Sequence, residues 1–168
     1  MATLIILRGY PGSGKTTVGK MLEREGFGKF IDHNAILNFI TSITSNDDGI
    51  YAEIHALEKS MAKKLLADGK NTIVARGFSS QKSIDSYVEI AKETNSRHLV
   101  IRLSAATEIL EKRVQSEERK LDFNPTTTAD SLLTWIEQNP LENLDGEYSI
   151  DASEELVDVV SSITKVIE

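Results

Sequence analysis

The sequence predicts an α/β protein in which a parallel sheet is covered by helices on both faces. Short aliphatic runs of strand length alternate with longer segments of helical periodicity along the whole chain. This alternation is typical of parallel sheets, because the connection between neighbouring parallel strands is usually a helix. The length of 168 residues suits about one domain, so we expect a single domain over residues 1–168.

The first half of the chain shows this alternation clearly. Residues 3–7 and 27–32 are short apolar runs that predict strands, and residues 15–24 between them have a helical pattern that Gly26 ends. Two further helices are predicted by apolar residues at spacings of three and four. They place Ile36, Phe39, Ile40 and Ile43 on one face of the first, and Ile54, Leu57, Met61 and Leu65 on one face of the second.

The second half continues in the same way. Strands are predicted at 71–77, 98–103 and 146–151, with helices at 84–91, 105–120, 129–138 and 156–167. We expect Asp151 and Ser153 to cap the last helix, and Trp135 and Phe123 to serve in packing. The sequence therefore predicts five strands separated by helices.

Composition limits the classes of function. The formal net charge of −7 argues against a long nucleic-acid groove or an anionic membrane surface as main partner, while a local basic pocket stays open. The chain has no cysteine, which excludes disulfides, thiolate metal sites and cysteine nucleophiles. No apolar run approaches the length of a membrane span and no signal-peptide pattern opens the chain, so we expect a cytoplasmic protein without membrane contact.

The most specific motif lies between the first strand and the first helix. Gly9, Gly14, Lys15 and Thr16 match the pattern G-x-x-x-x-G-K-[ST] in full. Glycines let backbone N–H groups turn inward around a phosphate, and the following helix adds its positive end. The segment predicted to bind the nucleotide contains Gly9, Pro11, Gly12, Ser13, Gly14, Lys15, Thr16 and Thr17.

Two residues of this motif have defined roles in such sites. Lys15 would reach the β- and γ-phosphates of ATP, and the Thr16 hydroxyl would bind Mg²⁺. A tight turn that simply joins a strand to a helix needs neither the three glycines nor the Lys-Thr pair. We therefore expect ATP and Mg²⁺ as cofactors, with Thr16 as the metal ligand.

With these motifs, the chain resembles the small P-loop kinases, including nucleoside-monophosphate, shikimate, gluconate and polynucleotide kinases and chloramphenicol phosphotransferase. The resemblance covers nearly the whole chain in element order and is most specific over residues 4–20. It implies a three-layer P-loop NTPase fold with a five-stranded parallel sheet, flanking helices and a short helical lid. It also implies an acceptor-binding region at about 32–56 and a lid at about 113–130.

The resemblance assigns further site residues. Asp32 ends the second predicted strand, where these kinases often hold an aspartate that contacts the acceptor hydroxyl, and a carboxylate there could position the nucleophile. Asp32 could equally cap the helix that starts near Ala35. Arg113 and, more loosely, Arg119 match lid arginines that touch the adenine or the transferring phosphates, although both could form ion pairs on the helix surface.

The chain also departs from the pattern of these kinases. Arg76 stands where nucleoside-monophosphate kinases carry an acidic residue after the third strand, so the usual Walker B acid is absent at that position. Arg76 could bind an anionic acceptor or form a surface ion pair. Ala35 replaces the arginine with which polynucleotide kinases hold an acceptor phosphate. Region 38–56 instead offers mostly neutral groups, namely Asn38, Thr41, Tyr51, Glu53 and His55.

These observations predict a kinase that transfers the γ-phosphoryl group of ATP to a small-molecule hydroxyl or phosphate acceptor. The predicted catalytic residues are Lys15, Asp32, Arg113 and Arg119, and the predicted acceptor-binding residues are Asp32 and Arg76. An ATP-binding regulator, an ATPase without a dedicated acceptor and a polynucleotide 5′-hydroxyl kinase stay open as alternatives. The expected partners are ATP and an unidentified acceptor, with end-binding of nucleic acid still open, in a monomer or homodimer.

Overall fold

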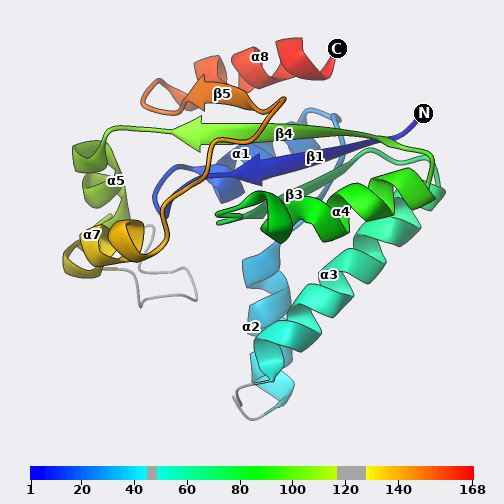
Figure 1. Cartoon of the computed structure of the whole chain (residues 1–168), viewed down its shortest axis with the longest axis horizontal. Helices are drawn as coiled ribbons and strands as arrows, with labels where there is room; N and C mark the ends of the chain where they lie inside the picture. The colour runs from blue at the N-terminus through cyan, green and yellow to red at the C-terminus, as the bar shows by residue number, and fades with distance from the viewer. Residues whose placement is uncertain (45–48, 117–127) are drawn as a thin grey trace.

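The computed structural model describes residues 1–44, 49–116 and 128–168, and its centre is a five-stranded sheet (Figure 1). The strands are β1 (Thr3–Arg8), β2 (Lys29–Ile31), β3 (Thr72–Arg76), β4 (Arg97–Ser104) and β5 (Tyr148–Asp151). Their order in the sheet is β2-β3-β1-β4-β5, and every neighbouring pair is parallel. The predicted fold class is confirmed.

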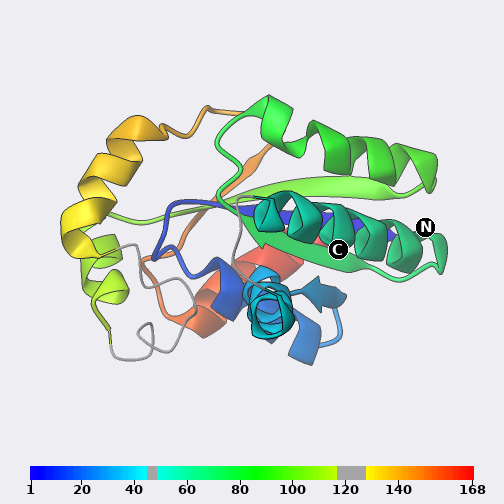
Figure 2. The ribbon, with the colours of Figure 1, turned by 90° about the horizontal axis from the view of Figure 1, so that it is seen from below.

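Helices cover both faces of this sheet (Figures 1 and 2). On one face lie α3 (Ile50–Ala67) and α4 (Gln81–Glu93), and on the other lie α1 (Lys15–Arg24) and α8 (Leu156–Ile167). The remaining described helices are α2 (His33–Ile43), α5 (Thr107–Val114) and α7 (Ala129–Gln138). Figure 1 shows α5 and α7 beyond the arrowheads of the strands, which is the edge where open α/β sheets bind ligands.

The alternation of side chains along β1 explains why the sheet has two separate cores. Leu4 and Ile6 pack with α3 and α4, whereas Ile5 and Leu7 pack with α1 and α8. Successive side chains of a strand point to opposite faces, so one continuous apolar run can serve both layers. β1 is buried throughout, as expected for a central strand. None of the helices in the described residues is long and apolar enough to cross a membrane.

The buried face of α3 differs from the predicted one. Leu57 and Met61 are 40% and 38% exposed. The buried side chains instead recur every four residues, as Ile50, Ile54, Glu58, Ala62 and Leu66. Ile54 belongs to both faces, whereas Leu57 and Met61 lie one position before the buried Glu58 and Ala62. The true face carries a glutamate in its middle.

The start of α2 and the cap of α8 also differ from the predictions. α2 begins at His33, and Asp32 is its N-cap. α8 begins only at Leu156, with Glu155 as N-cap, so Asp151 and Ser153 do not cap it. The Asp151 carboxylate accepts a hydrogen bond from Ser153 N at 2.8 Å, and this bond lowers the pKa of Asp151 below its usual value. The prediction for Phe123 lies outside the described residues.

Candidate active site

The segment between β1 and α1 forms a tight loop that requires glycine at two positions. Gly12 has a φ of +83°, and a Cβ atom there would lie 2.8 Å from Leu110 O of α5. At Gly9 a Cβ atom would lie 2.5 Å from Leu103 O of β4. The two glycines therefore let the loop pass close to the ends of β4 and α5. The loop leads directly into the N-terminus of α1, whose first N–H groups have no partner within the helix.

Lys15 lies across this loop rather than away from it. Its ammonium group donates hydrogen bonds to Gly9 O at 2.9 Å and to Tyr10 O at 2.8 Å, and it lies 3.3 Å from Ser13 Oγ. The cation therefore sits over the concave side of the glycine-rich loop. The loop with its helix N-terminus and this ammonium group suit an anion such as a phosphate.

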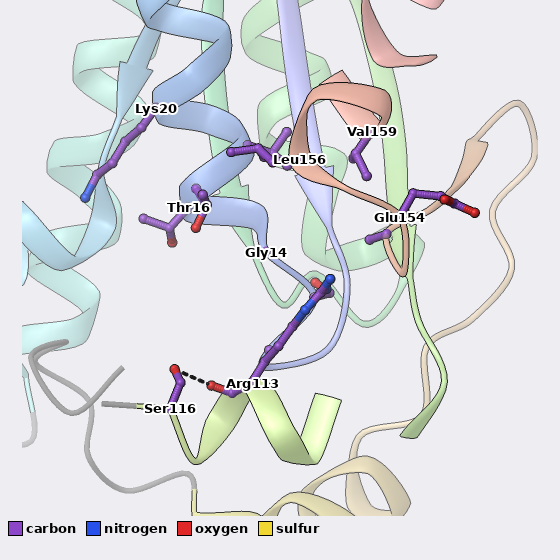
Figure 3. Close-up of a pocket in the computed structure, with 13 residues that line it drawn as sticks. Gly14, Thr16, Lys20, Arg113, Ser116, Glu154, Leu156 and Val159 are labelled. Atoms are coloured by element: carbon purple, nitrogen blue, oxygen red, sulfur yellow. Dashed lines mark hydrogen bonds between the residues drawn. The ribbon is translucent and has the colours of Figure 1, made fainter. Parts of the chain in front are cut away.

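A pocket of about 410 Å³ opens beside the loop. Three elements meet there: the loop with the start of α1, the end of α5, and the connection from β5 into α8 (Figure 3). The lining residues are Gly12, Ser13, Gly14, Thr16, Thr17, Val18, Lys20, Arg113, Ser116, Ala152, Glu154, Leu156 and Val159. Its volume lies within the range of small-molecule and cofactor sites.

The pocket brings together residues that are far apart in the sequence. Arg113 points from α5 toward the loop near Gly14, as Figure 3 shows. Glu154, from the connection after β5, lines the same pocket, as do Leu156 and Val159 of α8. Arg113 therefore lines the same pocket as the loop, and its predicted role stays a prediction. The predicted Arg119 and most of the predicted lid lie outside the described residues.

Asp32 has the capping role that the sequence offered as one of two alternatives, and its acceptor role stays a prediction. One carboxylate oxygen accepts hydrogen bonds from Asn34 N and Ala35 N at the start of α2. The other oxygen lies 3.0 Å from the ammonium group of Lys20 on α1. Asp32 therefore caps a helix and also lies at the edge of the sheet beside α1, so capping does not remove it from the candidate site.

Arg76, at the end of β3, pairs with a carboxylate that is almost completely buried. Its guanidinium lies 3.7 Å from Glu58 Oε2, and the Glu58 side chain is 3% exposed. The predicted alternative of a surface ion pair is therefore wrong, because the partner is internal. Arg76 also lies 5.4 Å from the centre of the Phe78 ring and 3.4 Å from His55 Nδ1. These contacts hold the guanidinium in one place.

Glu58 connects this arginine to two other side chains. His33 Nδ1 lies 2.8 Å from Glu58 Oε1, and the Tyr87 hydroxyl donates to Glu58 Oε2 at 3.4 Å. Burial and the Glu58 carboxylate raise the pKa of Tyr87 to about 12. Burial and the nearby Arg76 lower the pKa of His55 to about 4, so its imidazole is neutral at pH 7. We call His33, His55, Glu58 and Arg76 the acceptor-side cluster.

The loop after β3 is held by a second arginine that sequence reasoning missed. Arg8 at the end of β1 is completely buried and lies 2.6 Å from the Glu147 carboxylate. It also donates to the backbone oxygens of Phe78 and Glu142. Phe78 has a φ of +29°, a conformation that only a well-supported loop keeps at a bulky residue. Arg8 supplies part of that support.

Sequence reasoning missed Glu58 as well. The available signal was a carboxylate in phase with Ile54 and Ala62 on the buried face of α3. Arg8 offered a similar signal, as a charge at the end of an otherwise apolar run. A buried charge requires a partner, so each of these positions predicts an ion pair.

A protein-family model described as an AAA domain matches residues 4–138, from β1 to the end of α7. The chain belongs to the AAA domain family. No curated protein matches this AAA-domain chain.

Several solved kinases are similar to this AAA-domain chain in structure. A shikimate kinase from Bacteroides thetaiotaomicron has a TM-score of 0.66 at 20% identity, covering 98% of each chain. The APS kinase of Mycobacterium tuberculosis, in complex with AMPPNP and APS, has a TM-score of 0.70 at 13% identity and covers 99% of this chain and 97% of that one. A gluconokinase from Sinorhizobium meliloti 1021 has a TM-score of 0.64 at 16% identity and covers 98% of this chain and 91% of that one. At these identities the likeness shows the fold, which is that of the small P-loop kinases.

Proposed function

We propose that the protein is an ATP-dependent phosphotransferase that moves the γ-phosphoryl group to a small-molecule acceptor. The observation that carries the proposal is the glycine-rich loop, with Lys15 hydrogen-bonded across it, beside a pocket of about 410 Å³. The similar structures include kinases of three different small molecules, which supports an acceptor of that kind. APS kinase in complex with AMPPNP supports ATP as the donor.

Each part of the pocket has a proposed role in holding the donor. The loop amides from Gly12 to Thr16 and the ammonium group of Lys15 stabilise the charge of the β- and γ-phosphates. Arg113 binds the phosphates or the base from the side of α5. The apolar side chains of α8 receive the base, because moving an aromatic ring from water into apolar surroundings costs less free energy than moving a phosphate there.

The loop also fits a divalent cation held beside the phosphates. Thr16 offers one hydroxyl in the pocket wall, and Mg²⁺ in such sites takes its other ligands from phosphate oxygens and water. Mg²⁺ would neutralise charge on the β- and γ-phosphates. Thr16 is the residue that we propose to hold it.

The acceptor would lie on the side of α2 and α3, near the ends of β2 and β3. Asp32 orients the acceptor hydroxyl, in addition to capping α2. The acceptor-side cluster, in which Arg76 is fixed by Glu58, lines the same region.

The alternatives differ in measurable ways. An ATP-binding regulator would bind Mg·ATP without turnover on any acceptor, whereas an ATPase would show hydrolysis that no acceptor stimulates. A polynucleotide 5′-hydroxyl kinase would phosphorylate oligonucleotide ends. The net charge of −7 and Ala35 in place of an acceptor arginine disfavour this last alternative.

The test is ATP turnover with pooled small-molecule alcohols, for the wild type and Lys15→Ala. We expect a product that carries the γ-phosphoryl group, and a loss of turnover of about a hundred- to a thousandfold in the variant, as when other preorganised charge-stabilising donors are removed. Lys64→Ala serves as control, because Lys64 lies on the exposed side of α3 and pairs only locally with Asp68. Equal turnover in Lys15→Ala and wild type, at equal thermal stability, contradicts the proposal.

A further inference from the structure

We infer that His33 and His55 form a hydroxyl-binding pair, in which one imidazole accepts and the other donates a hydrogen bond to the acceptor. The acceptor class would then be a polyhydroxylated molecule rather than a phosphomonoester. The inference rests on the proposed function, because it names the acceptor class of the same site. It follows from the hydrogen bonds and ion pairs that join His33, His55, Glu58 and Arg76.

The partner of His33 determines which of its ring nitrogens carries the proton. His33 Nδ1 lies 2.8 Å from Glu58 Oε1, and the other neighbours of Glu58, Arg76 and the Tyr87 hydroxyl, are donors. A carboxylate surrounded by donors accepts from all of them, so His33 Nδ1 carries hydrogen and donates. In the neutral ring Nε2 is then an acceptor.

His55 has the opposite arrangement. Its Nδ1 lies 3.4 Å from an Arg76 nitrogen, and a guanidinium can only donate. His55 Nδ1 is therefore the acceptor of that bond and Nε2 carries the hydrogen. The lowered pKa of His55, caused by burial and by Arg76, agrees with a neutral ring at pH 7.

The two rings lie side by side, with their centres 5.8 Å apart. Glu58 is buried beneath them, whereas His33 and His55 are both partly exposed. Because Nδ1 of each ring faces an internal partner, each Nε2 edge faces away from that partner. The pair thus offers one acceptor and one donor, and a hydroxyl group is both a donor and an acceptor.

The charges of the cluster favour the same class of ligand. The positive charge of Arg76 is offset by Glu58 at 3.7 Å, and the His55 imidazole is neutral at pH 7. Arg76 and Glu58 therefore have no net charge between them with which to hold a phosphate dianion. Neutral polyols and hydroxy acids need only the hydrogen bonds.

A metal ion is the competing occupant. His33, His55 and Glu58 offer ligand atoms that all lie within 4.8 Å of one another. Their inner atoms, however, are already hydrogen-bonded within the cluster, and the guanidinium of Arg76 would lie beside a bound cation. Repulsion from this charge disfavours a divalent ion there.

The experiment is NMR of the three imidazoles of the chain. His98, the third histidine, is exposed on β4 and serves as an internal reference. Long-range proton–nitrogen spectra at pH 7.5 report the tautomer of each ring. We expect hydrogen on Nδ1 of His33 and on Nε2 of His55. Hydrogen on Nε2 of His33, or on both nitrogens of His55, overturns the inference.

The same spectra test the ligand class on protein saturated with Mg²⁺ and AMPPNP, which keeps AMP out of the nucleotide pocket. Ribitol, gluconate and shikimate are the hydroxylated probes, and inorganic phosphate and AMP are the phosphate probes. We expect saturable shifts of His33 and His55, but not of His98, with at least one hydroxylated probe. The inference is overturned if the histidine signals shift with the phosphate probes alone, or if no probe shifts them at all. It is also overturned if Zn²⁺ binds His33, His55 and Glu58 at micromolar concentration.

Matched asparagine variants keep the internal bonds and remove the outer nitrogens. In His33→Asn the amide N–H still donates to Glu58, and in His55→Asn the amide oxygen still accepts from Arg76. Each should weaken binding of the responding hydroxylated probe by about five- to tenfold, as expected for one hydrogen bond, while His98→Asn leaves it unchanged. Unchanged binding in both variants overturns the inference.

The amide signals of the phosphate loop distinguish failure of the proposed function from failure of the hydroxyl-binding pair. AMPPNP binding is read from the amide signals of Gly12, Gly14 and Thr16, independently of the histidines. If AMPPNP binds and the histidines ignore the hydroxylated probes, the hydroxyl-binding pair alone is refuted. If AMPPNP does not bind, the proposed function is refuted whatever the histidines do.

Discussion

Asp32 is a helix cap for which we also propose a chemical role. Its carboxylate caps α2 through two backbone N–H groups and also lies beside Lys20 of α1. Asparagine can accept the same capping bonds but carries no charge. Comparing Asp32→Asn with Asp32→Ala therefore separates the two roles.

For Asp32→Asn we expect little change in the free energy of unfolding and a decrease in kcat, with ATP affinity preserved. For Asp32→Ala we expect an additional destabilisation of about 1 kcal/mol, since the cap is lost as well. Urea unfolding and steady-state kinetics measure both effects. A kcat of Asp32→Asn equal to that of the wild type would remove Asp32 from the mechanism.

Arg8 is the residue whose loss should cost the most stability. Its buried guanidinium pairs with Glu147 at 2.6 Å and donates to backbone oxygens of the loops before β5 and after β3. Arg8→Met fills a similar volume but leaves a buried carboxylate and several carbonyl groups unpaired. We expect a destabilisation of about 3–5 kcal/mol in urea unfolding.

The double variant Arg8→Met with Glu147→Gln provides the control for Arg8, because it removes both charges. It should recover part of the lost stability, since no unpaired charge is left inside the protein. If Arg8→Met alone unfolds at the same urea concentration as the wild type, the ion pair does not hold the two loops together.

At the scale of elements, the phosphate loop and α5 depend on a close contact. A Cβ atom on Gly12 would lie 2.8 Å from Leu110 O and 3.2 Å from Val114 Cγ2. In Gly12→Ala, α5 must move outward and take Arg113 with it. We expect the KM for ATP to rise by about tenfold or more, because small displacements in a preorganised site are costly.

Gly69→Ala is the matched control for Gly12→Ala. Gly69 follows α3 with a similar φ of +75°, yet a Cβ atom there would meet nothing within 4 Å. Both variants pay the cost of a positive φ, but only Gly12→Ala should change the KM for ATP. A similar KM in the two variants would show that the contact with α5 has no part in ATP binding.

α3 shows why the candidate site could be only partly predicted. The sequence predicted a buried stripe that includes Leu57, Met61 and Leu65, but the buried residues beside them lie one position further along the chain. Only the packing of α3 against the sheet and α4 decides which stripe is internal. The predicted stripe did not include Glu58, so the contacts of Glu58 with His33 and Arg76 could not be predicted.

At the scale of the whole molecule, the acceptor-side cluster makes folding stability depend on pH. Burial and Arg76 lower the pKa of His55 from the usual 6.5 to about 4, and Glu58, His33 and Lys59 also act on it. Between pH 6.5 and about 4 the unfolded chain binds a proton at this residue that the folded chain does not. Stability should therefore fall as the pH is lowered through this window.

We expect the midpoint of urea unfolding to fall more steeply between pH 7 and pH 4.5 in the wild type than in His55→Asn. The difference between the two curves isolates His55 from the carboxylates that titrate at lower pH. His98→Asn should follow the wild-type curve, because His98 is exposed. Parallel curves for wild type and His55→Asn would show that His55 is not held neutral by the fold.

The sequence by itself determined the strand and helix order, the parallel sheet and the phosphate loop. These features depend on local patterns: apolar runs of strand length, helical periodicity and the spacing of Gly9, Gly14, Lys15 and Thr16. The position of Asp32 at the end of a strand was likewise readable, because it depends on its immediate neighbours.

Only the tertiary structure decided which distant residues meet. Strand order brings the ends of β1, β2 and β3 to one edge, and α5 and α8 close the pocket beside the loop. There Arg113 approaches the phosphate loop, Arg8 finds Glu147, and a glutamate of α3 pairs with Arg76. These contacts join segments tens of residues apart, and their partners are chosen by packing and by the need to pair buried charges, which no local pattern encodes.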